Sequence, residues 1–237
     1  MKQQKDAIEA IYKELQKKRK HADITDLSVA INEIVYVFVG LRRVGKTYML
    51  YQRVLQLLAA GISIKDILFV NFEDERLSEI NSDDLNTILE VHYEMSGTDT
   101  KPILFFDEIQ VVDYWDKFVR RLADAKYTVY VTGSNAKMLS SDVATTLGGR
   151  FLICDIFPYS FFEYLNAKSL ELPDNWQHST IEKAKVSAAF NDYFHTGGLP
   201  ETIYFKDKRS LLQSLYQKIY LGDIWTSVRA ITYVTAR

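Results

Sequence analysis

The sequence predicts a doubly wound α/β fold: a parallel sheet with helices on both faces, followed by a smaller helical subdomain. Continuous apolar and β-branched runs alternate with segments of helical periodicity over about 120 residues. Runs of that kind are typical of parallel strands, which are buried on both faces and need crossover connections. From Tyr159 onward such runs are sparse and helical spacing dominates. We therefore expect a sheet domain over 1–156 and a helical lid subdomain over 157–237.

The expected elements of the sheet domain follow one another in a regular order. An N-terminal helix over 4–20 carries a narrow apolar stripe and ends in the basic run 17–20. A helix over 46–60 follows the first strand after a glycine turn, and Gly61 is its expected C-terminal cap. The strands are expected at 34–40, 66–74, 102–108 and 127–134, with 150–157 as a candidate fifth.

Composition and charge narrow the classes of function. The chain has 237 residues, of which 47% are hydrophobic and 25% charged, as in an ordinary folded protein. Its formal net charge of -2 gives no global electrostatic case for nucleic acid or an anionic membrane. Cys154 is the single cysteine and the four histidines are far apart, so neither a disulfide nor a transition-metal site is expected. With no recognisable targeting signal, we expect a cytoplasmic protein.

The segment Gly40–Thr47, GLRRVGKT, matches G-x-x-x-x-G-K-[ST] at every fixed position and lies between an expected strand and an expected helix. Its glycines let consecutive backbone N–H groups converge on phosphates, and the helix adds its positive end. Lys46 is expected to reach the β- and γ-phosphates of ATP, and Thr47 to ligate Mg²⁺. The nucleotide-binding residues are predicted to be Gly40, Arg42, Arg43, Val44, Gly45, Lys46, Thr47 and Tyr48. For Arg42 and Arg43, phosphate contact, contact with a neighbouring subunit and plain solvation stay open.

Two adjacent carboxylates, Asp107 and Glu108, end the third expected strand. Such a pair faces the carboxyl edge of the sheet, where α/β folds bind ligands. In this arrangement an aspartate holds Mg²⁺ and the neighbouring glutamate polarises the attacking water. The sequence therefore assigns Asp107 to the metal and Glu108 to catalysis.

Two further polar residues are candidates for catalysis. Ser134 closes the fourth expected strand, where it either reaches the γ-phosphate or caps a following helix. Arg150 follows Gly148 and Gly149 and is predicted to stabilise transition-state charge in its own subunit or a neighbour. A surface arginine that begins a strand is the alternative.

In the chain, the strand over 66–74 intervenes between the phosphate-loop strand and the acidic strand, and a glutamate directly follows the aspartate. Both features are typical of the additional-strand, catalytic-glutamate division of P-loop NTPases. The motifs GLRRVGKT, ILFFDEIQ, VTGSNAKMLSSD, GGR, FPYSFFEY and HTGGLPE together resemble the AAA-type ATP-binding proteins of bacteria and archaea. In that family an AAA_14 ATPase domain precedes a domain of unknown function (DUF4143), and the group is similar to the STAND NTPases.

The resemblance implies roles for particular residues and a longer protein. Gly40, Gly45, Lys46 and Thr47 would form the Walker A loop, and Asp107 and Glu108 the Walker B pair. Ser134 would be the sensor and Arg150 the signature arginine. Because the family continues into a winged-helix segment and a further domain, the chain is expected to be an ATPase portion.

Three functions stay open at this point. The first is a Mg²⁺-dependent ATPase that drives a conformational change, with self-association or a partner protein. The second is a slow STAND-like switch in which tightly held ADP gates a partner or effector domain. The third is an ATP-regulated nucleic-acid adaptor, for which the sequence offers only the basic patches at 17–20 and 117–121. No membrane partner is expected.

Overall fold

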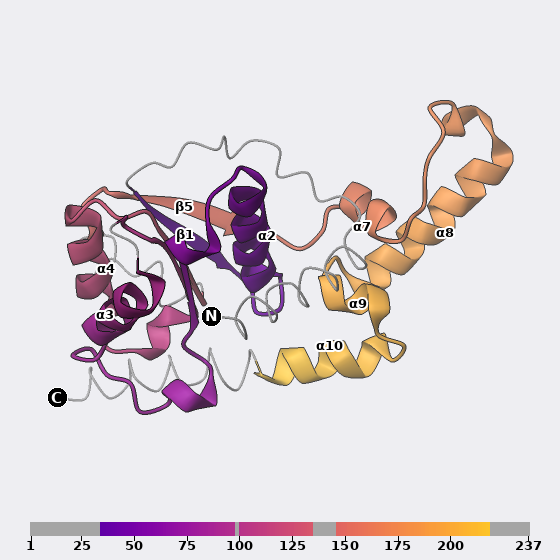
Figure 1. Cartoon of the computed structure of the whole chain (residues 1–237). Coiled ribbons are helices and arrows are strands. Elements are labelled where there is room, and N and C mark those ends of the chain that lie inside the picture. The colour runs from indigo at the N-terminus through magenta and orange to yellow at the C-terminus, as the bar shows by residue number, and fades with distance from the viewer. Residues whose placement is uncertain (1–33, 98–99, 135–145, 219–237) are drawn as a thin grey trace. The chain divides into compact units, whose positions relative to one another are not determined.

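The computed structural model describes residues 34–97, 100–134 and 146–218. The chain forms two compact units, Met1–Phe157 and Pro158–Arg237 (Figure 1). The N-terminal helix expected over 4–20 and its basic end lie outside the described residues. Among the described helices, none is long and apolar enough to cross a membrane.

The first unit contains a sheet of five parallel strands in the order β2-β3-β4-β1-β5. Its strands are β1 (Val35–Gly40), β2 (Ile67–Asn71), β3 (Ile103–Asp107), β4 (Val129–Ser134) and β5 (Phe151–Ile156). The predicted α/β fold class is confirmed. In the sheet, β2 lies at the edge beside β3, and β4 separates β1 from β3. The additional strand is therefore β4, and not the strand that the chain order suggested.

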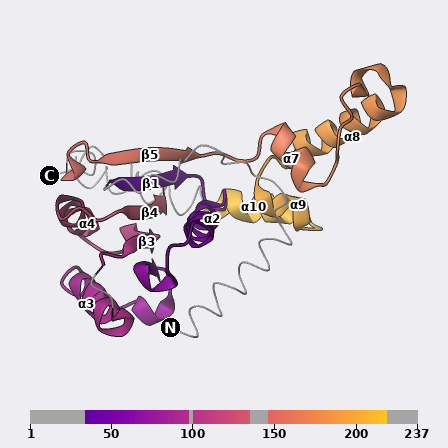
Figure 2. The ribbon, with the colours of Figure 1, turned by 45° about the horizontal axis from the view of Figure 1, so that its top comes forward.

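Helices cover both faces of this sheet, as Figure 2 shows: α2 lies on one side, and α3 and α4 on the other. Their bounds are Lys46–Ala59 for α2, Leu85–Ser96 for α3 and Trp115–Asp124 for α4, and short 3-10 turns occupy Ile64–Asp66, Glu75–Leu77 and Ile109–Val111. All six residues of β1 are buried, because alternate side chains enter the two cores. Tyr36 and Phe38 pack in the core on the α2 side, while Val37 and Val39 pack in the core of α3 and α4.

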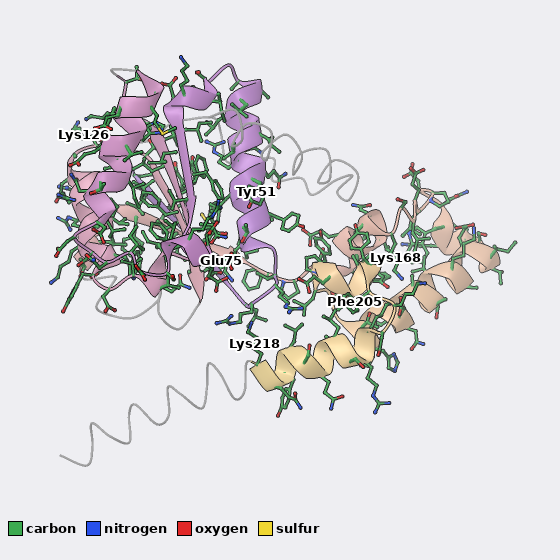
Figure 3. All side chains as sticks on the ribbon, turned by 60° about the horizontal axis from the view of Figure 1, so that its bottom comes forward. Tyr51, Glu75, Lys126, Lys168, Phe205 and Lys218 are labelled. Atoms are coloured by element: carbon green, nitrogen blue, oxygen red, sulfur yellow. The ribbon has the colours of Figure 1, made fainter. Side chains whose placement is uncertain are left out.

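A row of stacked aromatic rings crosses the sheet beneath α2. Tyr130 of β4 stacks on both Tyr36 and Phe105, with ring centroids 4.7 Å apart in each pair. Phe69 continues the row 6.1 Å from Phe105, and Tyr51 of α2 stacks on Phe69 at 5.0 Å (Figure 3). Aromatic pairs of this kind add stabilisation beyond their buried area. The row therefore fixes α2, and the loop that leads into it, against the sheet.

The second unit is helical in its described part, with α7 (Phe161–Ala167), α8 (Thr180–Thr196), α9 (Pro200–Tyr204), α10 (Lys208–Gln217) and a 3-10 turn at Trp176–His178. A capping box begins α7, in which Ser160 and Glu163 satisfy one another's backbone N–H groups. The motifs around FPYS and GGLP meet here, because the N–H of Tyr159 donates to the carbonyl of Gly198 over 2.7 Å. A Cβ on Gly198 would lie 2.2 Å from the carbonyl oxygen of Tyr159, which explains the glycine.

One carboxylate ties three of these helices together. The side chain of Asp192 on α8 accepts hydrogen bonds from Tyr164 on α7, Lys168 directly after α7 (Figure 3) and Lys208 on α10. These three donors hold the pKa of Asp192 well below its ordinary value. The network replaces part of the apolar core that α8 lacks, since no residue of α8 is fully buried.

Candidate functional site

The predicted phosphate loop runs from the end of β1 into α2. Gly45 has φ 103° and ends the loop in a left-handed conformation that favours glycine. Gly40 is required for a different reason: a Cβ there would lie 2.3 Å from the backbone oxygen of Ile156 on β5. The Lys46 side chain is buried and folds over the loop, with Nζ 3.2 Å from the Gly40 carbonyl and 3.1 Å from that of Leu41.

The charges near Lys46 oppose the effect of its burial. Burial lowers the pKa of Lys46, while the carboxylates of Glu108 and Asp107 raise it. Glu73, just after β2, also acts on the pKa values of Lys46 and Asp107. The lysine therefore lies inside an acidic cluster at the carboxyl edge of the sheet, where an anionic ligand would favour its charged form.

Asp107 ends β3 and its side chain is only 2% exposed. Its Oδ1 accepts hydrogen bonds from the Thr47 hydroxyl at 3.2 Å and from the Thr132 hydroxyl at 2.5 Å. Burial raises the pKa of Asp107, and the bonds from Thr132 and Thr47 lower it. The two residues predicted to hold a metal, Thr47 and Asp107, are thus brought into contact across 60 positions of the sequence.

Glu108 follows with an unusual backbone, since its φ of 52° lies in the left-handed region although it is not a glycine. Such a conformation costs on the order of 1–3 kcal/mol and persists where surrounding contacts impose it. Here the Glu108 N–H donates to Thr132 Oγ1 over 2.9 Å. The amide of Gln110 donates to Glu108 Oε2 over 2.5 Å. The backbone and the carboxylate of Glu108 are therefore each held by a hydrogen bond.

Two residues of this network, Thr132 and Gln110, were not among the sequence predictions. Thr132 is fully buried on β4, and its hydroxyl joins Asp107 to the backbone of Glu108. A signal for it existed: strand periodicity puts Thr132 on the same face as Ser134. Gln110 lies two residues after Glu108 in the turn Ile109–Val111, a position for which the sequence gives no periodic signal.

The remaining predicted loop residues lie around the same edge. The backbone of Ser134 pairs with Gly40, which puts the predicted sensor position beside the phosphate loop. Arg43 adopts a left-handed conformation with φ 61°, and Arg42 lowers the pKa of Lys46 by its charge. Tyr48 is 40% exposed near the start of α2. The predicted roles of Ser134, Arg42, Arg43 and Tyr48 stay predictions.

Arg150 lies at the opposite end of the sheet. It precedes Phe151, which pairs with the first residue of β1, whereas the phosphate loop follows the last residue of that strand. A strand rise of about 3.3 Å per residue separates the two ends by roughly 20 Å. The guanidinium of Arg150 forms an ion pair with Asp124 at the end of α4. This position does not support action in its own subunit. Action across an interface stays a prediction, and so does the alternative of a surface arginine that begins a strand.

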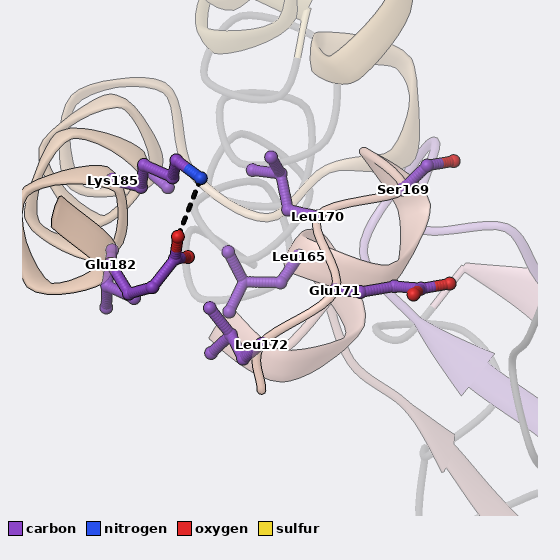
Figure 4. Close-up of a pocket in the computed structure, with 9 residues that line it drawn as sticks. Leu165, Ser169, Leu170, Glu171, Leu172, Glu182 and Lys185 are labelled. Carbon is purple, nitrogen blue, oxygen red and sulfur yellow. Dashed lines mark hydrogen bonds and ion pairs between the residues drawn. The ribbon is translucent and has the colours of Figure 1, made fainter. Parts of the chain in front are cut away.

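A pocket of about 210 Å³ lies within the helical unit and contains none of the phosphate-loop residues (Figure 4). Leu165, Leu170 and Leu172 point into it, and the ion pair of Glu182 with Lys185 closes one side. Sites for small molecules are usually larger, at about 300–1,000 Å³. The chemistry of the predicted site is therefore found at the sheet edge and not in this pocket.

The residues at the sheet edge fit a magnesium nucleotide. Asp107 and Thr47 offer a carboxylate and a hydroxyl oxygen, and Mg²⁺ takes oxygen ligands of this kind together with phosphates. The start of α2 and the Lys46 ammonium supply the positive charge that phosphates need. The arrangement can bind a nucleoside triphosphate and hold a carboxylate, Glu108, beside it.

Comparisons with known proteins identify the family of the chain. The profile of the AAA domain family (AAA_14) matches residues 32–165. The uncharacterized protein MJ1544 of Methanocaldococcus jannaschii is 38% identical over 216 residues, which are 89% of this chain and 46% of that protein. An uncharacterized protein of Haemophilus influenzae is 31% identical over 196 residues, 81% of this chain and 46% of that protein. The chain thus spans about half the length of these curated relatives.

A solved structure shows the same fold. The S. cerevisiae Hsp104–ADP complex superposes with a TM-score of 0.50 and 14% identity, over 97% of this chain and 34% of that one. At this identity the likeness concerns the fold alone. The family profile covers more than half of the chain, including the phosphate loop and the Asp107–Glu108 pair. The chain therefore belongs to the AAA domain family of nucleotide-binding P-loop ATPases.

Proposed function

We propose that this chain binds ATP with Mg²⁺ and hydrolyses it to ADP and phosphate, and that the cycle drives a conformational change. One observation carries the proposal above all: Asp107 contacts Thr47 of the phosphate loop at 3.2 Å, and the next residue, Glu108, presents a second carboxylate at the same edge. In this proposal Asp107 binds the metal and Glu108, the next residue at the end of β3, activates the water.

Different residues of the chain would bind the phosphates and the metal ion. The N–H groups at the start of α2 and the Lys46 ammonium would bind the β- and γ-phosphates. Thr47 and Asp107 would hold Mg²⁺, which supplies charge neutralisation on the phosphate oxygens when bound. Thr132 keeps the Asp107 carboxylate oriented by its hydrogen bond.

Hydrolysis requires a base beside the γ-phosphate, and Glu108 is the candidate. Its carboxylate would accept a proton from water as the water oxygen attacks the γ-phosphorus. The bond between that phosphorus and the β–γ bridging oxygen breaks, and its electron pair leaves with ADP. Phosphate departs and Glu108 returns its proton to solvent.

The test is steady-state ATP hydrolysis by the full-length protein. Glu108→Gln should lower the rate by about 10²–10⁴-fold while ATP still binds, because the amide cannot accept the proton. Lys46→Ala should abolish ATP binding in calorimetry. Glu90→Gln, an exposed glutamate on α3, is the matched control and should leave the rate unchanged.

Two results would point elsewhere. A rate that survives Glu108→Gln would contradict the assignment of the base. ADP that co-purifies with the protein, together with negligible turnover, would favour the nucleotide switch. The chain spans about half the length of its curated relatives. We therefore propose that the conformational change acts on a further domain or on a partner.

A further inference from the structure

The proposed base is held by Gln110, the last residue of the ILFFDEIQ motif, to which the sequence assigned no role. Gln110 lies in the turn Ile109–Val111 that directly follows Glu108, and Ile109 between them is fully buried. The Gln110 amide Nε2 donates to Glu108 Oε2 over 2.5 Å. Because the buried Ile109 anchors the turn, the two polar side chains on either side of it face one another.

The remaining contacts of Glu108 leave one oxygen available. Its backbone is fixed by the bond from its N–H to Thr132 Oγ1 and by its left-handed conformation. Its Oε2 is occupied by the Gln110 amide. Among the described residues, no hydrogen bond to its Oε1 is present. The carboxylate is thus anchored through one oxygen, and the other can accept a proton.

The orientation of the Gln110 amide supports a functional reason for the contact. Its Oε1 is buried and has no hydrogen-bond partner among the described residues. Turning the amide over would place this oxygen against the Glu108 carboxylate, which repels it. The amide therefore keeps its donor on Glu108 although its own acceptor stays unsatisfied. Compromises of this kind cluster at functional sites.

We propose that Gln110 is a positioning residue that fixes the Glu108 carboxylate so that one oxygen is free to take the proton of the attacking water. The inference rests on the proposed hydrolysis of ATP. Because Gln110 would act through the Glu108 carboxylate, its loss should affect the chemical step and not the binding of the nucleotide. Misplacing a reacting group by about 1 Å costs on the order of 10²-fold in rate.

The experiment compares two variants in the full-length protein. Gln110→Leu keeps the approximate size and removes both the donor and the unsatisfied acceptor. We expect kcat to fall about 10–100-fold, with the KM and Kd for ATP within about two-fold of wild type and an unchanged or higher melting temperature. Gln110→Glu places a like charge against Glu108 and should lower kcat at least as far.

A matched control removes the same kind of bond elsewhere. On the surface of α3, the Asn86 amide donates to Glu90 over 2.6 Å, and its Oδ1 accepts a hydrogen bond from Arg121 over 3.2 Å. Asn86→Leu should leave kcat unchanged. Rates are expressed per nucleotide-binding site, so that loss of folded protein is not counted as loss of catalysis. If both Gln110 variants lower the rate only by lowering the number of such sites, the residue is structural and the inference fails.

A second comparison separates positioning from other effects. In the Glu108→Gln background, Gln110→Leu should cause no further loss, because the carboxylate on which it acts is gone. Independent, multiplying losses would overturn the inference. A wild-type rate in Gln110→Leu would overturn it while the proposed function stands. Absence of hydrolysis in the wild type would instead overturn the proposed function, and the positioning role with it.

Discussion

Replacing Thr132 by valine removes one hydroxyl from the interior of the first unit and keeps the shape of the side chain. That hydroxyl donates to Asp107 Oδ1 over 2.5 Å and accepts the N–H of Glu108 over 2.9 Å. The side chain is fully buried, so water cannot replace either bond. Thr132→Val therefore leaves both Asp107 and the Glu108 backbone with a missing partner.

The size of the effect follows from these two bonds. A hydrogen bond to a charged group contributes about 1.5–3 kcal/mol, and one between neutral groups about 0.5–1.5 kcal/mol. Their loss should lower the free energy of unfolding by about 2–4 kcal/mol. For a protein of this size, 1 kcal/mol shifts the melting temperature by roughly 2–4 °C. We expect the melting temperature to fall by roughly 5–15 °C.

The loss should also appear in the metal-dependent part of ATP binding. Without the Thr132 hydroxyl, only the bond from Thr47 holds the Asp107 carboxylate, so its orientation is less fixed. Hydrogen bonds that orient a metal-binding carboxylate typically contribute about 10–100-fold to metal affinity. Calorimetry should therefore show a weaker effect of Mg²⁺ on ATP affinity, while ATP binding in EDTA stays unchanged because Lys46 and the loop are untouched.

Two controls separate the hydroxyl from general destabilisation. Thr132→Ser keeps the hydroxyl and loses one methyl group, which costs about 1 kcal/mol. Thr202, in the helical unit, is also fully buried, and its hydroxyl donates to the Leu199 carbonyl over 2.7 Å. Thr202→Val should lower stability without changing the Mg²⁺ dependence. The reasoning is refuted if Thr132→Val binds Mg-ATP like the wild type and is no less stable than Thr132→Ser.

Three further variants test other parts of the structure. Burial raises the pKa of Asp107, so the contribution of this carboxyl group to stability is present below about pH 4 and is lost as the pH rises through the folded pKa. Asp107→Asn should therefore have a higher melting temperature than the wild type at pH 7 without nucleotide. A lower melting temperature would contradict this expectation. The pKa of Asp192 is lowered, so Asp192→Asn should lower the free energy of unfolding at pH 7 by about 1–2 kcal/mol, a value that allows for the partial exposure of the carboxylate. Urea titrations should show that the difference in stability between the variant and the wild type shrinks below pH 4. In Gly40→Ala the added methyl group would push β1 away from the Ile156 carbonyl of β5, which should lower the free energy of unfolding in urea by about 1–3 kcal/mol. A variant as stable as the wild type would show that the two strands can move apart without this loss.

The sequence was sufficient for the fold class and for the strand, glycine turn and helix around residues 40–47, because both depend on local patterns. A strand buried on both faces must be apolar along its length, and β1 is buried at all six positions. The loop of an anion site must bend through glycine, and Gly45 has the left-handed conformation expected there. Periodicity and glycine spacing are visible in one chain without knowledge of its contacts.

Contacts between distant segments were decided by the tertiary structure alone. The strand that separates β1 from β3 is β4, since strand order depends on which crossovers pack best and not on order in the chain. Arg150 precedes β5 at the far end of the sheet from the loop, a placement that follows only from the parallel register of β5 with β1. Thr132 and Gln110 join the site through hydrogen bonds to Asp107 and Glu108. Both residues stand inside motifs visible in the sequence, but a motif does not show which atoms its hydroxyl or amide contacts. Their roles follow only from the partners that folding brings within about 3 Å.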